Sequence, residues 1–264
     1  MEHELKKHLG SIISEKFNRK ISVIVLHGAS ASGKSTFAKN LKNALKSLFK
    51  VLILSCDTFF KTSETSDTKI YNFDSPAAID WQAAHKFLKA IHNKEKYLPN
   101  YHYCFETSKS TKLEDIENPF PEILIIEGIY AMNLFSENCF DSKEFSPYDS
   151  NLSGFMKNPY KYPKFGILNI KLRTCKDMMS EIRIFRDMDE RGRTKNETIK
   201  QFSDYVWPAT KKWVENPIFK PDIILIHGTF NKKKLKILFK AITKHFLGNE
   251  KYDFETKHSL MPKN

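Results

Sequence analysis

The stretch Gly28-Ala-Ser-Ala-Ser-Gly-Lys-Ser35 decides the fold, because it fits the pattern G-x-x-x-x-G-K-[ST]. An apolar run at residues 21–26 precedes it and is typical of a buried strand, and helical spacing of apolar residues begins near Ser35. This order predicts a phosphate-binding loop whose backbone N–H groups surround an anion. Lys34 would then reach the β- and γ-phosphates, and Ser35 would hold Mg²⁺. The alternative is a glycine turn that only caps a helix.

Outward from this loop, predicted strands alternate with predicted helices. Short apolar runs predict further strands at 51–54, 123–126, 166–172 and 223–226. Helical periodicity covers 1–19, 35–48, 79–92, 175–190, 195–214 and 232–246. Strands that are apolar on both faces indicate an α/β fold, with a parallel sheet of about five strands covered by helices on both faces. We expect a single domain over 1–264, with a core at about 20–246 and a loop or insertion at about 135–164.

The composition excludes several classes of protein. The chain has 264 residues, of which 41% are hydrophobic and 13% aromatic, which excludes a disordered chain. No apolar run approaches the length of a membrane span, and the first residues lack a signal-peptide core. Four widely spaced cysteines argue against a disulfide framework or a zinc knuckle, and the histidines show no zinc-ligand spacing. A reducing, cytoplasmic location fits best.

The basic residues are unevenly divided between lysine and arginine. The formal net charge is +12, with 37 Lys spread along the chain and 6 Arg. Dispersed lysines are typical of solvated faces, although they also allow nucleic-acid or polyanion binding. Five arginines fall within residues 173–193, where planar guanidinium groups would suit phosphate oxygens. The alternative is a helix with exposed salt bridges to Asp187, Asp189 and Glu190.

Two carboxylates follow predicted strands. Asp57 comes three residues after the run at 51–54, and Glu127 directly follows the run at 123–126. Ligands of open parallel sheets bind at the carboxyl ends of the strands. Phosphoryl transfer needs a metal ligand and a group that accepts the proton of the nucleophile. Both acids suit those tasks, although either alone could be a helix cap or a solvated acid. We expect Cys56 and His27 to be packing residues.

Six blocks of the sequence, at 28–35, 54–61, 71–80, 99–101, 125–128 and 183–193, carry a combined signal. The most specific are Asn72-Phe-Asp-Ser-Pro76 and Arg186-Asp-Met-Asp-Glu-Arg-Gly-Arg193. In this order the blocks resemble the uridine/cytidine kinases of the phosphoribulokinase/uridine kinase group of P-loop kinases. The resemblance covers about 21–246 and implies a P-loop NTPase fold with an Arg-rich lid at about 178–200.

The resemblance also implies an activity and its residues. It implies ATP-dependent phosphorylation of the ribose 5′-hydroxyl of uridine or cytidine, in pyrimidine salvage, with ATP and Mg²⁺. It implies no membrane or nucleic-acid partner and allows a homo-oligomer. Asp57 and Lys34 would be catalytic, and Ser35 and Glu127 would hold the metal. ATP would contact Gly28, Ala29, Ser30, Ala31, Ser32, Gly33, Lys34, Ser35, Thr36, Arg186, Arg191 and Arg193. The nucleoside would contact Asp57, Phe60, Asp74, Tyr101, Arg183 and Gln201.

Two departures leave the nucleobase open. Phe60 stands where the family commonly has tyrosine, and Glu106 stands where it often has a histidine that touches the base. The alternatives are a nicotinamide riboside kinase, which residues 57–61 and 205–208 also resemble, or another small-molecule P-loop kinase. A nucleic-acid-binding P-loop ATPase and an inactive relative are less favoured. Trp81 could stack on a base, but its helical position favours packing.

Overall fold

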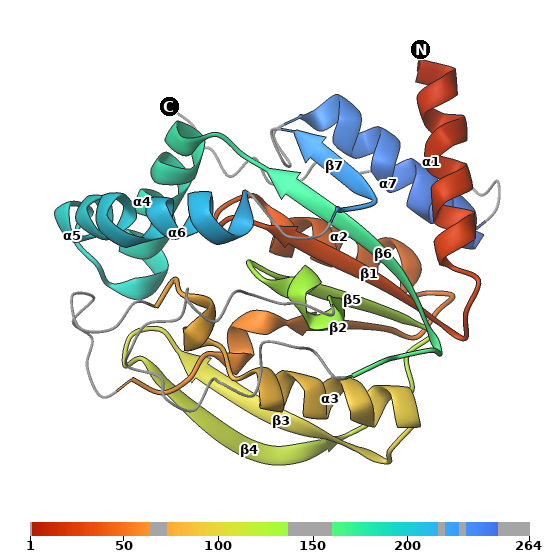
Figure 1. The fold of residues 1–264 in the computed structure, drawn as a ribbon, viewed down its shortest axis with the longest axis horizontal. Coiled ribbons are helices and arrows are strands. Elements are labelled where there is room, and N and C mark those ends of the chain that lie inside the picture. The colour runs from red at the N-terminus through yellow and green to blue at the C-terminus, as the bar shows by residue number, and fades with distance from the viewer. Residues whose placement is uncertain (1, 64–72, 137–159, 216–219, 227–230, 248–264) are drawn as a thin grey trace.

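A parallel five-stranded sheet forms the centre of the computed structural model, which describes residues 2–63, 73–136, 160–215, 220–226 and 231–247 (Figure 1). Its strands lie in the order β2-β5-β1-β6-β7, and all four neighbouring pairs are parallel. Their bounds are β1 Ile21–Gly28, β2 Val51–Ser55, β5 Ile123–Gly128, β6 Phe165–Arg173 and β7 Ile223–Ile226. The five predicted strands are therefore confirmed.

Helices cover both faces of this sheet. Ile24 and Leu26 of β1 pack with helices α1 (Glu2–Lys16), α2 (Lys34–Leu45) and α7 (Lys232–Leu247). Val23 and Val25, which point to the other face, pack with α3 (Trp81–Asn93) and the 3-10 helix η3 (Ala131–Phe135). All four side chains are fully buried. Because each such burial contributes roughly 1.5–3 kcal/mol, the run at 23–26 is apolar on both faces rather than alternating.

An antiparallel hairpin that the sequence did not predict lies beside α3 (Figure 1). It consists of β3 (Tyr97–Cys104) and β4 (Lys109–Glu117), with an irregular register between Leu98 and Asn100. Nearly every residue of β4 is exposed, so the strand lacks an alternating apolar pattern. Pro99 within β3 further weakens the strand signal.

The segment predicted to form a lid, which we call the lid segment or lid, is helical and lies at one end of the sheet (Figure 1). It comprises α4 (Lys176–Arg191) and α5 (Lys195–Gln201), and α5 begins with a capping box between Thr194 and Glu197. The helix predicted at 195–214 continues through π-helical turns at Phe202–Val206 and Thr210–Val214, which flank the short helix α6 (Trp207–Ala209). Pro208, which lacks an N–H donor, lies between the two π-helical turns.

The lid segment begins and ends beside the same strand, β6. It starts just after β6 and ends at Glu215, whose backbone O accepts a hydrogen bond of 2.9 Å from Lys171 Nζ. Arg173 Nε lies 2.8 Å from Glu215 Oε2. Lys171 and Arg173 both belong to β6, so both ends of the lid are attached to the carboxyl end of one strand.

The structure tests some of the other sequence-based expectations only in part, because not every residue is described. The helix predicted at 35–48 ends at Leu45, and most of the predicted insertion, residues 137–159, lies outside the described residues. Cys56, Cys104 and Cys175 are free thiols, while Cys139 lies outside the described part of the chain.

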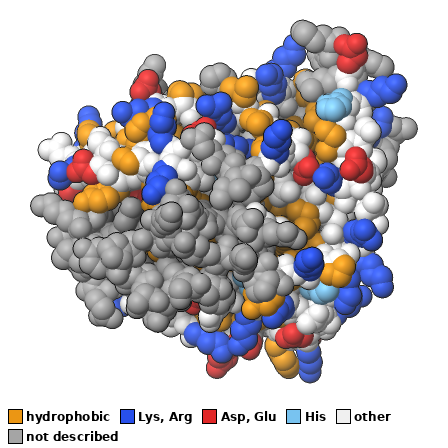
Figure 2. All heavy atoms as spheres, viewed as in Figure 1, with side chains coloured by type: hydrophobic (Ala, Val, Ile, Leu, Met, Phe, Trp, Pro, Cys, Tyr) orange, Lys and Arg blue, Asp and Glu red, His pale blue; other side chains and the backbone are white. Residues whose placement is uncertain are grey.

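Lysine and arginine side chains are dispersed over the described part of the face in Figure 2. Across the described ranges, the helices lack the combined length and apolarity that crossing a membrane requires.

Candidate functional site

The loop at residues 28–35 joins β1 to α2, as its pattern predicted. Gly33 has a φ of 86°, a left-handed conformation that glycine adopts without strain. A Cβ on Gly28 would lie 2.3 Å from the backbone O of Leu172 on β6, so this position excludes a side chain. The loop therefore passes close to β6 and presents its backbone at the N-terminus of α2, where helix N–H groups and the helix dipole favour an anion.

Lys34 is buried at the start of α2. Its Nζ donates a hydrogen bond of 2.7 Å to the backbone O of Ala29, within the loop itself. Burial lowers the pKa of Lys34, whereas the nearby carboxylates of Glu127 and Asp57 act to raise it. The ammonium group is thus held beside two acids at the base of the loop.

Glu127, at the carboxyl end of β5, accepts two hydroxyl hydrogen bonds. Ser55 Oγ donates to Oε1 over 2.6 Å, and Ser35 Oγ donates to Oε2 over 3.2 Å. Burial, followed by the negative charge of Asp57, raises the pKa of this carboxyl group. A bound cation would relieve both effects, and Mg²⁺ prefers oxygen ligands such as a carboxylate and a hydroxyl. Glu127 and Ser35 therefore form a donor set that fits Mg²⁺.

Asp57 lies in a 3-10 helix, Cys56–Phe59, immediately after β2. A close approach fixes the position of this helix, because a Cβ built on Gly128 would lie 2.5 Å from Cys56 Cβ. Cys56 is itself buried, as its predicted packing role requires. The backbone of β5 thus supports the turn that carries Asp57.

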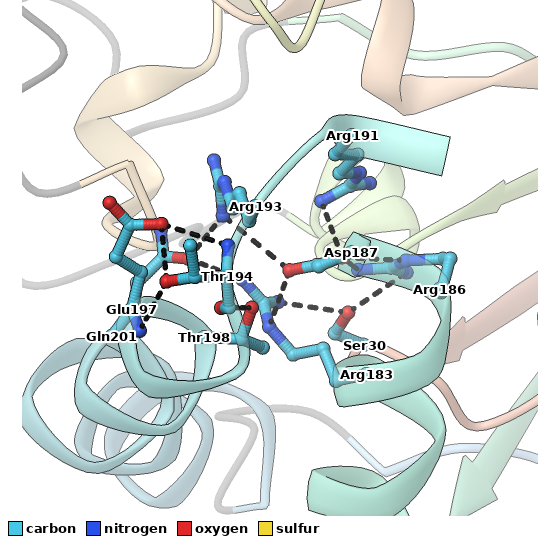
Figure 3. Close-up of polar contacts among 10 residues, drawn as sticks. All are labelled: Ser30, Arg183, Arg186, Asp187, Arg191, Arg193, Thr194, Glu197, Thr198 and Gln201. Carbon is cyan, nitrogen blue, oxygen red and sulfur yellow. Dashed lines mark hydrogen bonds and ion pairs between the residues drawn. The ribbon is translucent and has the colours of Figure 1, made fainter. Parts of the chain in front are cut away.

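Arginines of the lid gather around one carboxylate (Figure 3). Arg186 Nη2 lies 2.7 Å from Asp187 Oδ1, and the guanidinium groups of Arg183, Arg191 and Arg193 lie within 3.5 Å of the same carboxylate. Burial alone would raise the pKa of Asp187, but the surrounding arginines lower it. The alternative prediction of exposed salt bridges is wrong for Asp187, because Asp187 and its partner Arg183 are buried.

The phosphate loop, the two strand-end carboxylates and the four arginines contribute to one cavity of about 1020 Å³. Of the residues predicted to act in the site, its walls contain Ser30, Ala31, Gly33, Lys34, Ser35, Thr36, Asp57, Phe60, Asp74, Glu127, Arg183, Arg186, Arg191, Arg193 and Gln201. Gly28, Ala29, Ser32 and Tyr101 are not among the described lining residues. The ring of Tyr101 instead packs against Phe59, with ring centroids 5.8 Å apart.

The hairpin forms another part of the cavity wall. Phe105 lies at the end of β3, and the guanidinium carbon of Arg191 is 3.9 Å from its ring centroid. Phe60 packs against Tyr103 and Phe105. Glu106 also lines the cavity. The aromatic wall and the lid are therefore joined by a cation–π contact.

Sequence reasoning missed two of these contacts. Ser55 and Phe105 carry no motif, since one reaches Glu127 from another strand and the other lies on the unpredicted hairpin. Asp187 belongs to the motif block at 186–193 and is expected from the sequence as a salt-bridge partner, but its position among four arginines was not predicted. Trp81, by contrast, is buried and donates from Nε1 to the backbone O of Pro76, so the packing interpretation is confirmed.

Comparisons with known proteins agree with this geometry. The model of the "Phosphoribulokinase / Uridine kinase family" matches residues 23–141. A uridine kinase of Schizosaccharomyces pombe is 27% identical over 85% of this chain but only 44% of its own length. A uridine kinase of Ureaplasma parvum is 24% identical over 83% of this chain and 95% of its length. A candidate fructose transport system kinase from Silicibacter shares the fold, with a TM-score of 0.55 and 15% identity over 85% of this chain and 98% of that structure.

Proposed function

From the similarity to the phosphoribulokinase/uridine kinase family, we propose that this chain is a member of that family and transfers the γ-phosphoryl group of ATP to the ribose 5′-hydroxyl of a nucleoside. One observation carries the proposal: Lys34, Asp57 and Arg193 line the same cavity although they are far apart in the sequence. These three residues represent the phosphate loop, the acceptor side and the lid. Their convergence supports a site where a phosphate donor and an alcohol meet.

The donor side would be formed by the loop. The backbone at 28–36 would surround the β- and γ-phosphates, and Lys34 would exchange its present bond to Ala29 for phosphate oxygens. Ser35 and Glu127 would hold Mg²⁺, which when bound neutralises charge on the phosphate oxygens. Ser55 would orient Glu127 through its 2.6 Å hydrogen bond.

The acceptor side would be organised by Asp57. Its carboxylate would accept the proton of the 5′-hydroxyl while that oxygen forms a bond to the γ-phosphorus. The bond from this phosphorus to the β–γ bridging oxygen would break, and ADP would leave. Asp74, Arg183 and Gln201 line the same cavity and would hold the nucleoside. Phe60, Tyr103 and Phe105 offer aromatic surface to a base.

The lid would stabilise charge on the transferring group. Arg186, Arg191 and Arg193 line the cavity, and guanidinium groups bind phosphate oxygens through paired hydrogen bonds. Closure of the lid over the phosphate loop would exclude water and so limit hydrolysis of ATP.

Glu106 bears on which nucleoside is accepted. Glu106 is one of the residues that line the cavity. A carboxylate accepts hydrogen bonds and attracts positive charge, so it would suit the amino group of cytosine or a cationic ring better than a carbonyl oxygen of uracil. Cytidine is therefore our first candidate, and nicotinamide riboside, which has a cationic ring, is the second.

A nucleoside panel tests the proposal. Purified protein is incubated with ATP, Mg²⁺ and either uridine, cytidine or nicotinamide riboside, and the products are identified by mass. We expect a nucleoside monophosphate and ADP in equal amounts. ATP hydrolysis stimulated by RNA, with no phosphorylated nucleoside, would instead favour a nucleic-acid-dependent ATPase.

Asp57→Asn is the matched control for the panel, since it keeps the shape of the side chain and removes its basicity. We expect turnover to fall at least ~100-fold, the usual scale for a positioned base, while ATP binding stays close to that of the parent. Turnover within a few-fold of the parent would exclude Asp57 as the base.

A further inference from the structure

The carboxylate of Asp187 lies at the centre of the lid and is fully buried (Figure 3). Its Oδ1 is 2.7 Å from Arg186 Nη2, 3.0 Å from Arg186 Nε and 3.4 Å from Arg191 Nη1. Its Oδ2 is 3.5 Å from Arg183 Nε and 3.4 Å from Arg193 Nη1. One negative charge thus contacts four positive charges, which we call the arginine cluster.

Two neutral oxygens also accept hydrogen bonds from the arginine cluster. Ser30 Oγ accepts from Arg183 Nη1 over 3.1 Å and from Arg186 Nη1 over 3.4 Å. Gln201 Oε1 accepts from Arg183 Nη2 over 3.2 Å and from Arg193 Nη1. A serine and an amide satisfy N–H donors without cancelling charge. Apart from Asp187, these contacts leave the like charges of the cluster unbalanced.

The excess positive charge faces the phosphate loop. Ser30 belongs to that loop, and all four arginines line the cavity. The side chains of Arg183 and Arg191 are only 5% and 13% exposed, so solvent screens their repulsion poorly. Asp74 attracts Arg183 from the acceptor side, but burial raises the pKa of its carboxyl group. Asp187 is the carboxylate in direct contact with the whole cluster.

We propose that Asp187 is the internal counter-ion of the arginine cluster: it holds the guanidinium groups when no phosphate is bound, and a polyphosphate entering the cavity takes over part of these contacts. The inference rests on the proposed function only for the binding of a polyphosphate, not for its transfer to an acceptor. Asp187 then opposes phosphate binding and stabilises the empty protein at the same time, because both effects arise from one charge.

Asp187→Asn separates these effects from a purely structural role. The amide retains the shape of the side chain but loses its charge, so the empty variant should melt at a lower temperature than the parent. Its affinity for inorganic tripolyphosphate should rise at least ~5-fold, the lower end of ordinary coupling between sites. Added tripolyphosphate should therefore narrow the difference in melting temperature between variant and parent.

Affinity is measured by calorimetry with tripolyphosphate at low salt, without Mg²⁺ or nucleoside. Asp222→Asn is the matched control, because Asp222 pairs with Lys16 at 2.9 Å and does not line the cavity. It should leave tripolyphosphate affinity unchanged. Equal or weaker binding by Asp187→Asn would overturn the proposal while leaving the proposed kinase reaction intact. No binding by the parent would overturn both.

Gln201→Glu tests the counter-ion role of Asp187 by adding a negative charge to the arginine cluster instead of removing one. It also tests the proposal if Asp187→Asn does not fold. Because Gln201 Oε1 already accepts from Arg183 and Arg193, the substitution adds a second carboxylate at an existing contact. We expect a higher melting temperature for the empty protein and a tripolyphosphate affinity at least ~5-fold weaker. Unchanged or tighter binding would contradict the counter-ion role.

Discussion

Gly128→Ala should inactivate the protein without touching a substrate-binding side chain. The added Cβ would lie 2.5 Å from Cys56 Cβ and 3.0 Å from Cys56 Sγ. Carbon atoms in contact normally stay about 3.5–4.0 Å apart, so the two segments must separate by about 1 Å. Because the close atom is the Cβ of Cys56 rather than a flexible end, the backbone must move. Asp57 is the next residue and moves with it.

The displacement sets the size of the effect. A misplacement of 1 Å can cost about 100-fold in rate, so we expect kcat to fall by about that factor. Overpacking of this kind costs about 1–3 kcal/mol in the free energy of unfolding. ATP affinity should change much less, because the phosphate loop does not carry Cys56.

The assay combines steady-state kinetics on the best nucleoside of the panel with urea unfolding. The double variant Cys56→Gly, Gly128→Ala removes the clashing atoms, so its kcat should be at least ~10-fold higher than that of Gly128→Ala alone. A double-mutant cycle measures this coupling between positions 56 and 128. Gly10→Ala is the control, since its Cβ would meet no atom within 4 Å and should stabilise α1 by roughly 0.5–1 kcal/mol. Full activity of Gly128→Ala, or no recovery in the double variant, would refute the reasoning.

Three other changes probe the site. Lys34→Ala should abolish activity by weakening ATP binding, and calorimetry that finds parental ATP affinity would contradict the phosphate-loop role. Ser55→Ala removes the 2.6 Å bond to Glu127 and should raise the Mg²⁺ concentration for half-maximal activity roughly 10–100-fold; an unchanged Mg²⁺ titration would argue against it. Burial, with Lys171 and Lys34, lowers the pKa of His27 from 6.5 to about 3, so the unfolded chain binds a proton below pH 6.5 that the folded chain does not. The parent should therefore lose about 1.4 kcal/mol per pH unit relative to His27→Leu as the pH falls from 6.5 toward 3, measured by urea unfolding, and parallel profiles would refute this.

The sheet and its phosphate loop were predictable because their signals are local. A strand buried on both faces is mostly apolar, as β1 is at 23–26, and the loop needs its glycines and lysine at fixed spacing. The positions of Asp57 and Glu127 followed from one rule, that the carboxyl ends of parallel strands meet at one edge. Their presence in a common cavity agrees with that rule.

The hairpin and its contacts were not predictable, because they depend on residues that are far apart in the sequence and meet only in the folded chain. The exposed β4 lacks an apolar pattern, so the chain gives no local reason to place Phe105 beneath Arg191. Ser55 resembles any other serine until β2 and β5 pair and bring it to Glu127. The motif of Tyr101 predicts a substrate contact, but it gives no sign that the ring packs on Phe59.

The attachment of the lid to β6 has a mechanical consequence. Cys175, the N-cap of α4, follows the end of that strand by two residues, and Glu215, where the helical run ends, contacts Lys171 and Arg173 of the same strand. If the segment closes as a lid, as we propose, two neighbouring attachment points would favour rotation about the line that joins them over translation away from the phosphate loop.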